Sequence, residues 1–100
     1  MEKYIRAIEK AKEEMQMYHD CRVKACSDLE REYNTTDALD MYYLARNIIK
    51  GIRLVAIADH DIDDDAWHQI IEKGDEIEDH YFDEYNEMIK KIMKELGYEE

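Results

Sequence analysis

The sequence predicts an all-α fold: an antiparallel bundle of three long helices, in a single helical domain over residues 1–100. The chain has no proline and only three glycines, whereas sandwiches and barrels need turn residues every few positions. Hydrophobic residues make up 45% of the chain, enough for one modest core. Apolar residues recur at helical spacing over three stretches, and a fourth helix is expected if the third stretch breaks at Gly74.

The first predicted helix covers residues 2–33. Its apolar stripe alternates spacings of three and four residues, as on the buried side of an amphipathic helix, and includes Tyr4, Ile8, Ala11, Met15, Tyr18, Arg22, Ala25 and Leu29. Arg22 lies within this stripe. A buried arginine needs a partner, so we expect an ion pair with a carboxylate of the acidic third segment. The helix should end before residues 34–37, where Thr35 or Thr36 is the expected N-cap of the next helix.

The second predicted helix covers residues 37–58 and is apolar on two sides. One broad side includes Met41, Ile49 and Ile52. A helix with two apolar sides is central in its bundle or shared with a partner. We therefore expect a homodimer, or a second-face contact, through the other side, which consists of Leu39, Tyr43, Arg46, Lys50, Leu54 and Ile57. Gly51 either allows close helix approach or marks a bend.

The third predicted segment covers residues 64–96. Asp63 is the expected N-cap, and Gly97 is the expected C-terminal cap. Gly74, followed by Asp75 and a capping-box pattern, leaves open whether the segment is one helix or two. The apolar stripe consists of Ile70, Ile77, Tyr81, Tyr85, Met88 and Ile92, with Trp67 and Leu96 at its ends.

The net charge of −12 lies entirely within residues 59–87. That segment holds 13 acidic residues and one basic residue, Lys73, while the rest of the chain holds 13 of each. The plain interpretation is that the acidic residues keep the protein in solution. The sharper hypothesis is a negative surface that binds a positive one. Strong acidity argues against direct binding to nucleic acid or to an anionic membrane.

This pattern favours a small non-enzymatic binding protein, an inhibitor whose acidic helical surface meets a basic, nucleic-acid-binding partner protein. In size, charge and helicity the chain resembles the small acidic inhibitors of phages and mobile elements, including nucleic-acid mimics and anti-CRISPR proteins. Carboxylates one helical turn apart can imitate a row of phosphates. The candidate residues are Asp61, Asp63, Asp64, Asp65, Glu72, Asp75, Glu76, Asp79, Asp83 and Glu87, with Trp67 and Tyr81 as anchors if they are exposed.

The alternative is a magnesium-dependent all-α nucleotide pyrophosphohydrolase or a divalent-cation-binding protein that uses the same carboxylates. Alternating Asp59, Asp61, Asp63 and Asp65 resemble a calcium loop, but Asp64 stands where such a loop needs glycine. We therefore assign no metal or cofactor. A metal enzyme would focus its carboxylates on one point, whereas a mimic would spread them over a surface.

The remaining signals concern where the protein resides. No apolar run long enough to cross a membrane is present, and the N-terminal residues do not read as a signal peptide. Cys21 and Cys26 lie five positions apart, about 140° around a helix, which excludes a disulfide between them at helical geometry. Two unpaired thiols predict a cytoplasmic protein.

Overall fold

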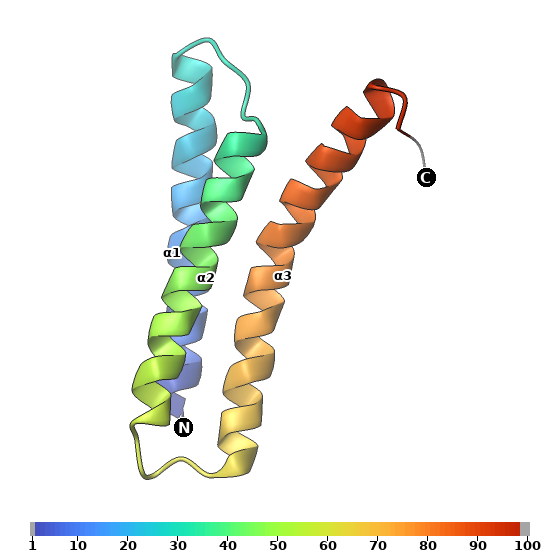
Figure 1. Cartoon of the computed structure of the whole chain (residues 1–100). Helices are drawn as coiled ribbons and strands as arrows, with labels where there is room; N and C mark the ends of the chain where they lie inside the picture. The colour runs from blue at the N-terminus through green and yellow to red at the C-terminus, as the bar shows by residue number, and fades with distance from the viewer. Residues whose placement is uncertain (1, 99–100) are drawn as a thin grey trace.

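The computed structural model describes residues 2–98, and it confirms an all-α bundle of three helices. The helices are α1 (Glu2–Asp28), α2 (Thr35–Ile57) and α3 (Asp64–Glu95), in that order along the chain. Figure 1 shows α1 and α2 as an antiparallel pair, called the hairpin below, with α3 alongside and leaning away from it toward its C-terminal end. The principal extents of the Cα positions are 51 × 35 × 15 Å, so the bundle is flat.

The core lies between the apolar stripes of the three helices. Its fully buried side chains include Ile8 and Met15 of α1, Met41 and Ile49 of α2, and Ile70 of α3. The most extensive helix contact joins α2 to α3. Within residues 2–98, no helix is long and apolar enough to span a membrane.

The first helix is shorter than predicted, because the chain turns at residues 29–34. Glu30 adopts a left-handed conformation with φ of 57°. The Arg31 N–H donates to the Cys26 carbonyl at 2.9 Å, and the Glu30 N–H donates to the Ser27 carbonyl at 3.0 Å. These two bonds form a Schellman ending without glycine. Tyr33, expected as the last residue of the helix, instead packs its ring 5.0 Å from that of His19.

The second helix begins with a different cap from the one expected. Asn34, and neither Thr35 nor Thr36, is the N-cap residue. Its side chain accepts the Thr36 N–H at 2.9 Å, and the Asp37 carboxylate accepts the Asn34 N–H at 2.9 Å. Asp37 at the third helical position therefore completes a capping box, which favours Asn34 as the start.

The third helix is continuous, so the four-helix alternative is wrong. Gly74 is buried and packs directly against α2: a Cβ at this position would lie 2.6 Å from Cγ2 of Ile49. The glycine thus allows close helix approach and does not stop the helix. The sequence also allows close helix approach at Gly51, but a Cβ on Gly51 would meet nothing within 4 Å, so within this molecule Gly74 and not Gly51 has this role. The predicted caps are confirmed: Asp63 accepts the Ala66 N–H at 2.8 Å, and Gly97 has φ of 91°.

Candidate binding surface

The 13 carboxylates of residues 59–87 fall into two groups. Three of them, Asp59, Glu78 and Glu84, are partly buried and contact other helices. The other ten are exposed, and they are the ten candidates that the sequence predicts: Asp61, Asp63, Asp64, Asp65, Glu72, Asp75, Glu76, Asp79, Asp83 and Glu87. The structure therefore separates carboxylates that hold the fold together from those that face solvent.

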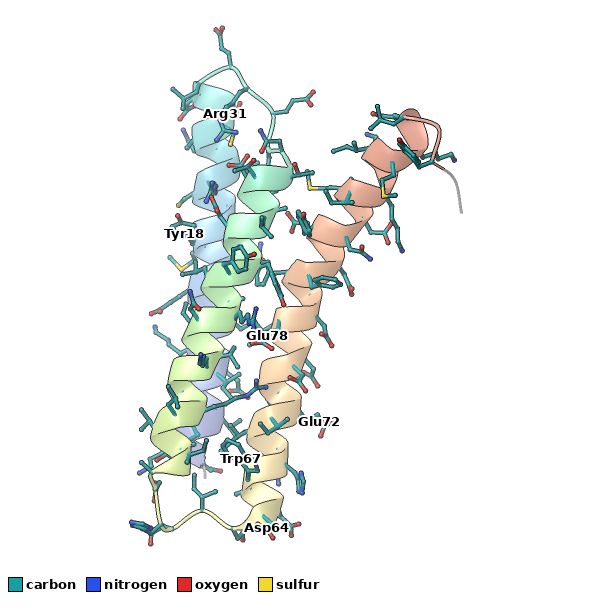
Figure 2. All side chains as sticks on the ribbon, in the orientation of Figure 1. Tyr18, Arg31, Asp64, Trp67, Glu72 and Glu78 are labelled. Carbon is teal, nitrogen blue, oxygen red and sulfur yellow. The ribbon has the colours of Figure 1, made fainter. Side chains whose placement is uncertain are left out.

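Six of the exposed carboxylates form a line along α3. We call this line the acidic row: Asp65, Glu72, Glu76, Asp79, Asp83 and Glu87. At 100° per residue, these positions fall within an arc of about 80°, on the side of α3 opposite Ile70 and Tyr81. The row is roughly 33 Å long at 1.5 Å per residue. Figure 2 shows the labelled Glu72 pointing away from the hairpin.

The acidic row is not neutralised by bases of the same molecule. Within residues 2–98, Glu87 is the one member with an ion pair, to Lys90 at 3.6 Å on the exposed surface. The other five have no basic side chain within 4.0 Å in this part of the chain. From Glu72 to Glu87, neighbours in the row lie three or four positions apart, where like charges repel each other.

The remaining four candidates lie outside the row. Asp63 caps α3, and the exposed Asp61 and Asp64 flank it at the end of the α2–α3 connection. Asp75 accepts a hydrogen bond from Arg53 of α2 at 2.9 Å. Asp63 and Asp75 therefore have structural roles, whereas within residues 2–98 five of the six carboxylates of the row have no ion pair.

Glu78 lies one turn beyond Asp75 and points toward α2 (Figure 2). Its carboxylate is 3.8 Å from Nη1 of Arg53, and the same guanidinium donates to the Ile71 carbonyl at 2.8 Å. Burial raises the pKa of Glu78 despite this arginine, because the low-dielectric contact disfavours the charged form. Arg53 therefore joins α2 to the acidic segment.

Asp59 ties the α2–α3 connection to the start of α1. It accepts a hydrogen bond from the Tyr4 hydroxyl at 2.5 Å, and its carboxylate lies 3.1 Å from Nζ of Lys3. The bond from Tyr4 and the bond from the Asp61 N–H hold the pKa of Asp59 well below its usual range. Asp59 is thus occupied by protein contacts.

Glu84 meets a histidine inside the bundle. Its Oε1 lies 3.1 Å from Nε2 of His19, whose ring packs against Tyr33. Burial is the main reason that the pKa of Tyr33 is raised, and the nearby Glu84 carboxylate adds to it. This cluster joins α1, the turn and α3.

The predicted partner of Arg22 is wrong. Arg22 pairs with α2 and not with α3: its Nε donates to Asp37 at 2.8 Å and its Nη2 to Asp40 at 2.6 Å. Arg31 also donates to both oxygens of Asp37, at 2.8 and 3.0 Å. The short turn brings the start of α2 beside the end of α1, so its carboxylates are nearer to Arg22 than those of α3.

The two aromatic candidates are not exposed anchors. Tyr81 is only 3% exposed and belongs to the core. Trp67 is partly buried and packs against the core, between α2 and α3 (Figure 2). The aromatic side chain that α3 does expose is Phe82, at 42%. It was missed because it lies off the apolar stripe, and it packs edge-on to Tyr42 with ring centroids 5.5 Å apart.

The carboxylates do not converge on a metal. Within residues 2–98, no three His, Cys, Asp or Glu side chains are placed to hold a metal ion. Of the candidate calcium ligands, Asp59 binds Tyr4 and Lys3, while Asp63 caps α3. A hollow of about 280 Å³ beside the row is lined by one carboxylate, that of Glu76. This geometry gives the magnesium-dependent alternative no support.

The second face of α2 is uncovered. Leu54 is 58% exposed and Ile57 is 64% exposed, and Tyr43, Arg46 and Lys50 are exposed as well, while Leu39 is partly buried. A homodimer through this face stays a prediction. Both cysteines are free thiols; Cys26 is buried and Cys21 is exposed.

Comparison with known proteins adds no further evidence, since no family model, no curated protein and no solved structure matches the chain.

Proposed function

We propose that this protein is a non-enzymatic binding protein that presents the acidic row of α3 to a basic, nucleic-acid-binding surface of another protein. The observation that carries the proposal is the arrangement of the row. Six exposed carboxylates follow one side of one helix for roughly 33 Å. A partner groove lined with lysine and arginine would find a regular line of negative charge there.

The spacing of the row supports a comparison with a nucleic-acid backbone. From Glu72 to Glu87, neighbouring carboxylates lie about 4.5–6 Å apart along the helix axis. Phosphates of one DNA strand lie about 3.4 Å apart along the duplex axis. The row is therefore less dense in charge than a duplex strand but similar in scale. It would compete for part of a nucleic-acid-binding groove, with fast and salt-sensitive association.

The energetics of α3 also favour a role in binding. Four neighbouring pairs of like charge in the row each cost a few tenths of a kcal/mol of helix stability. Solubility alone requires net charge but no particular arrangement of it. The row places like charges side by side on one continuous helix that is capped at both ends. This arrangement is therefore better explained by a surface that a cationic partner neutralises.

Affinity capture with a matched pair of variants tests the proposal. The row variant carries Glu72→Gln, Glu76→Gln, Asp79→Asn and Asp83→Asn. The control carries four substitutions of exposed carboxylates outside α3, namely Glu9→Gln, Glu13→Gln, Glu14→Gln and Glu30→Gln. Both variants have a net charge of −8, from −12 plus four, so they differ only in where charge was removed.

We expect wild type and control to capture a nucleic-acid-binding protein at low salt. DNA or RNA should displace that protein, high salt should release it, and the row variant should lose it. Equal capture by both variants would contradict the proposal, because the acidic residues would then serve solubility only. Capture of proteins that do not bind nucleic acid would also contradict the proposal.

A further inference from the structure

The second face of α2 combines exposed apolar side chains with cations. Tyr43, Leu54 and Ile57 are exposed, and the exposed Arg46 and Lys50 lie between them along the helix. At 100° per residue these five side chains fall within an arc of about 80°, and they span roughly 21 Å of the helix. Figure 1 shows α1 behind α2 and α3 beside it, and neither helix covers these side chains. Grouped apolar side chains bordered by polar ones mark an interaction surface.

This face is positive in a protein whose net charge is −12. Residues 41–58 hold three bases and no acid. Within residues 2–98, Arg53 is the one base of this stretch that has an ion pair, with carboxylates of α3. Arg46 and Lys50 therefore offer their positive charge to another molecule, and the ligand that complements them is anionic.

A second copy of this chain fits the face less well than an acidic partner does. In an antiparallel two-fold pairing centred on the face, Arg46 and Lys50 would lie against the same cations of the other copy, which repel them. The acidic row of another copy has the opposite charge. However, the arc of α3 that carries the row holds no apolar side chain between residues 65 and 87, so it would leave Leu54 and Ile57 uncovered. The occupant that fits carries both acidic and apolar side chains on one side.

Gly51 lies beside Leu54 at the edge of this face. A Cβ on Gly51 would meet nothing within 4 Å, so packing inside the molecule does not require this glycine. Glycine within a helix costs about 1 kcal/mol relative to alanine, but on an exposed side it lets the backbone of another chain approach closely. Beyond Gly51 is an apolar hollow of about 340 Å³, lined by Ile52 and Val55 of α2 and by Lys3, Tyr4 and Ala7 of α1. A partner backbone at Gly51 would be near enough to place a side chain in this hollow.

We propose that the second face of α2 binds an acidic amphipathic helix of another protein. The partner helix places two carboxylates, one turn apart, against Arg46 and Lys50. Its apolar side chains lie on either side of these carboxylates and cover Tyr43, Leu54 and Ile57. About four turns of helix match the length of the face. The inference does not depend on the proposed function, because the acidic row lies on another helix.

Selection from a displayed library of helical peptides of about four to five turns tests the inference. One side of each peptide is randomised, and the full-length protein selects binders at about 0.15 M salt. Charges more than about 8 Å apart are largely screened at this ionic strength. The acidic row, on the side of α3 away from the core, therefore does not exclude acidic peptides. We expect the enriched peptides to carry two carboxylates one turn apart between apolar residues.

Two variants with the same net charge locate the binding site. Arg46→Glu with Lys50→Glu reverses the cations of the face and should weaken binding of an enriched peptide at least tenfold. Lys90→Glu with Lys94→Glu is the control, because it reverses two exposed bases one turn apart on α3 and should leave binding unchanged. Both variants have a net charge of −16, from −12 minus four. Circular dichroism confirms that both keep their helix content.

Gly51→Gln tests the close approach without a change of charge. It should also weaken binding at least tenfold but should not lower the free energy of unfolding, since its side chain enters open space. Unchanged binding by this variant would overturn the close approach. Enrichment of peptides without carboxylates, or no enrichment at all, overturns the inference, and so does equal binding by the two charge variants. A dimer of the protein alone that Leu54→Glu dissociates would place a second copy on this face and would also overturn it.

Discussion

The guanidinium of Arg53 occupies the space that a side chain at residue 74 would need. A Cβ on Gly74 would lie 2.7 Å from Nη2 of Arg53 and 2.6 Å from Cγ2 of Ile49. Because Arg53 reaches across this point to Asp75 and to the Ile71 carbonyl, the glycine and the arginine together set the approach of α2 and α3. The close approach at Gly74 and the polar bridge made by Arg53 therefore lie at the same point between α2 and α3.

Gly74→Ala should therefore destabilise the protein. Alanine gains about 1 kcal/mol over glycine in helix propensity, but overpacking a core typically costs 1–3 kcal/mol, so we expect a net loss of about 1 kcal/mol in the free energy of unfolding. Gly51→Ala is the matched control and should stabilise by about 0.5–1 kcal/mol, because its Cβ enters open space. Urea denaturation measures both, and a stabilising Gly74→Ala would contradict the close packing.

Asp37 is the best-paired charged group of the hairpin. It is 1% exposed and accepts hydrogen bonds from Arg22, Arg31 and the Asn34 N–H. Asp37→Asn leaves two arginines without their shared carboxylate, so we expect a loss of about 3 kcal/mol. Asp40→Asn removes one exposed contact with Arg22 and should cost less than about 1 kcal/mol. Equal losses in chemical denaturation would contradict the assigned roles.

The stability of the protein should fall at acid pH through Asp37. The bonds from Arg31 and the Asn34 N–H hold its pKa well below the usual value of 3.8. A group whose pKa is depressed by folding stabilises above its unfolded pKa, and this stability is lost as pH falls through the folded pKa. We expect the loss to begin near pH 4. Thermal unfolding of wild type and Asp37→Asn between pH 6 and 2 measures it, and the variant should show the weaker pH dependence.

At alkaline pH, the stability of the protein should fall as pH rises, because of two tyrosines that are fully or partly buried. Burial raises the pKa of Tyr33 and of Tyr81 above the usual value of 10. Their contribution to stability is present below pH 10 and is lost as pH rises through the folded pKa. Spectrophotometric titration of tyrosinate should show that some tyrosines of the wild type ionise only above the usual pKa of 10. Tyr33→Phe should remove part of the tyrosinate signal that appears above the usual pKa of 10.

The acidic row should cost stability. Neutralising Glu76 and Asp83 as Glu76→Gln and Asp83→Asn removes all four neighbouring like-charge pairs between Glu72 and Glu87. We expect a gain of about 0.5–1.5 kcal/mol at low salt, which shrinks as salt is added. The control Glu30→Gln with Glu32→Gln removes the same charge from the turn between α1 and α2, where the two exposed residues are not one helical turn apart. A gain of the same size in this control would show that net charge, and not the row, is responsible.

Much of the architecture could be predicted from local signals. The apolar spacing through Ile8, Met41 and Ile70 places three stripes, and capping by Asp63 and Gly97 depends on neighbouring residues alone. The end of α1 could not be predicted in this way. The chain leaves the helix through a left-handed Glu30, a residue that does not signal such a turn as glycine does, and Arg31 beyond it contacts Asp37 of the next helix. The predicted break at Gly74 is wrong because the reason for this glycine is a contact with Ile49, which belongs to another helix.

For the candidate surface too, some features follow from the sequence and others depend on tertiary contacts. The sequence alone determined that the charge of −12 lies in residues 59–87, and helical periodicity determined that six carboxylates share one side. Only the tertiary structure decided that Asp59, Glu78 and Glu84 are withdrawn from that surface by Tyr4, Arg53 and His19. It also decided that Tyr81 is buried while Leu96 is not. Periodicity specifies the side of a helix on which a residue lies, whereas burial depends on how far the neighbouring helices extend along that side.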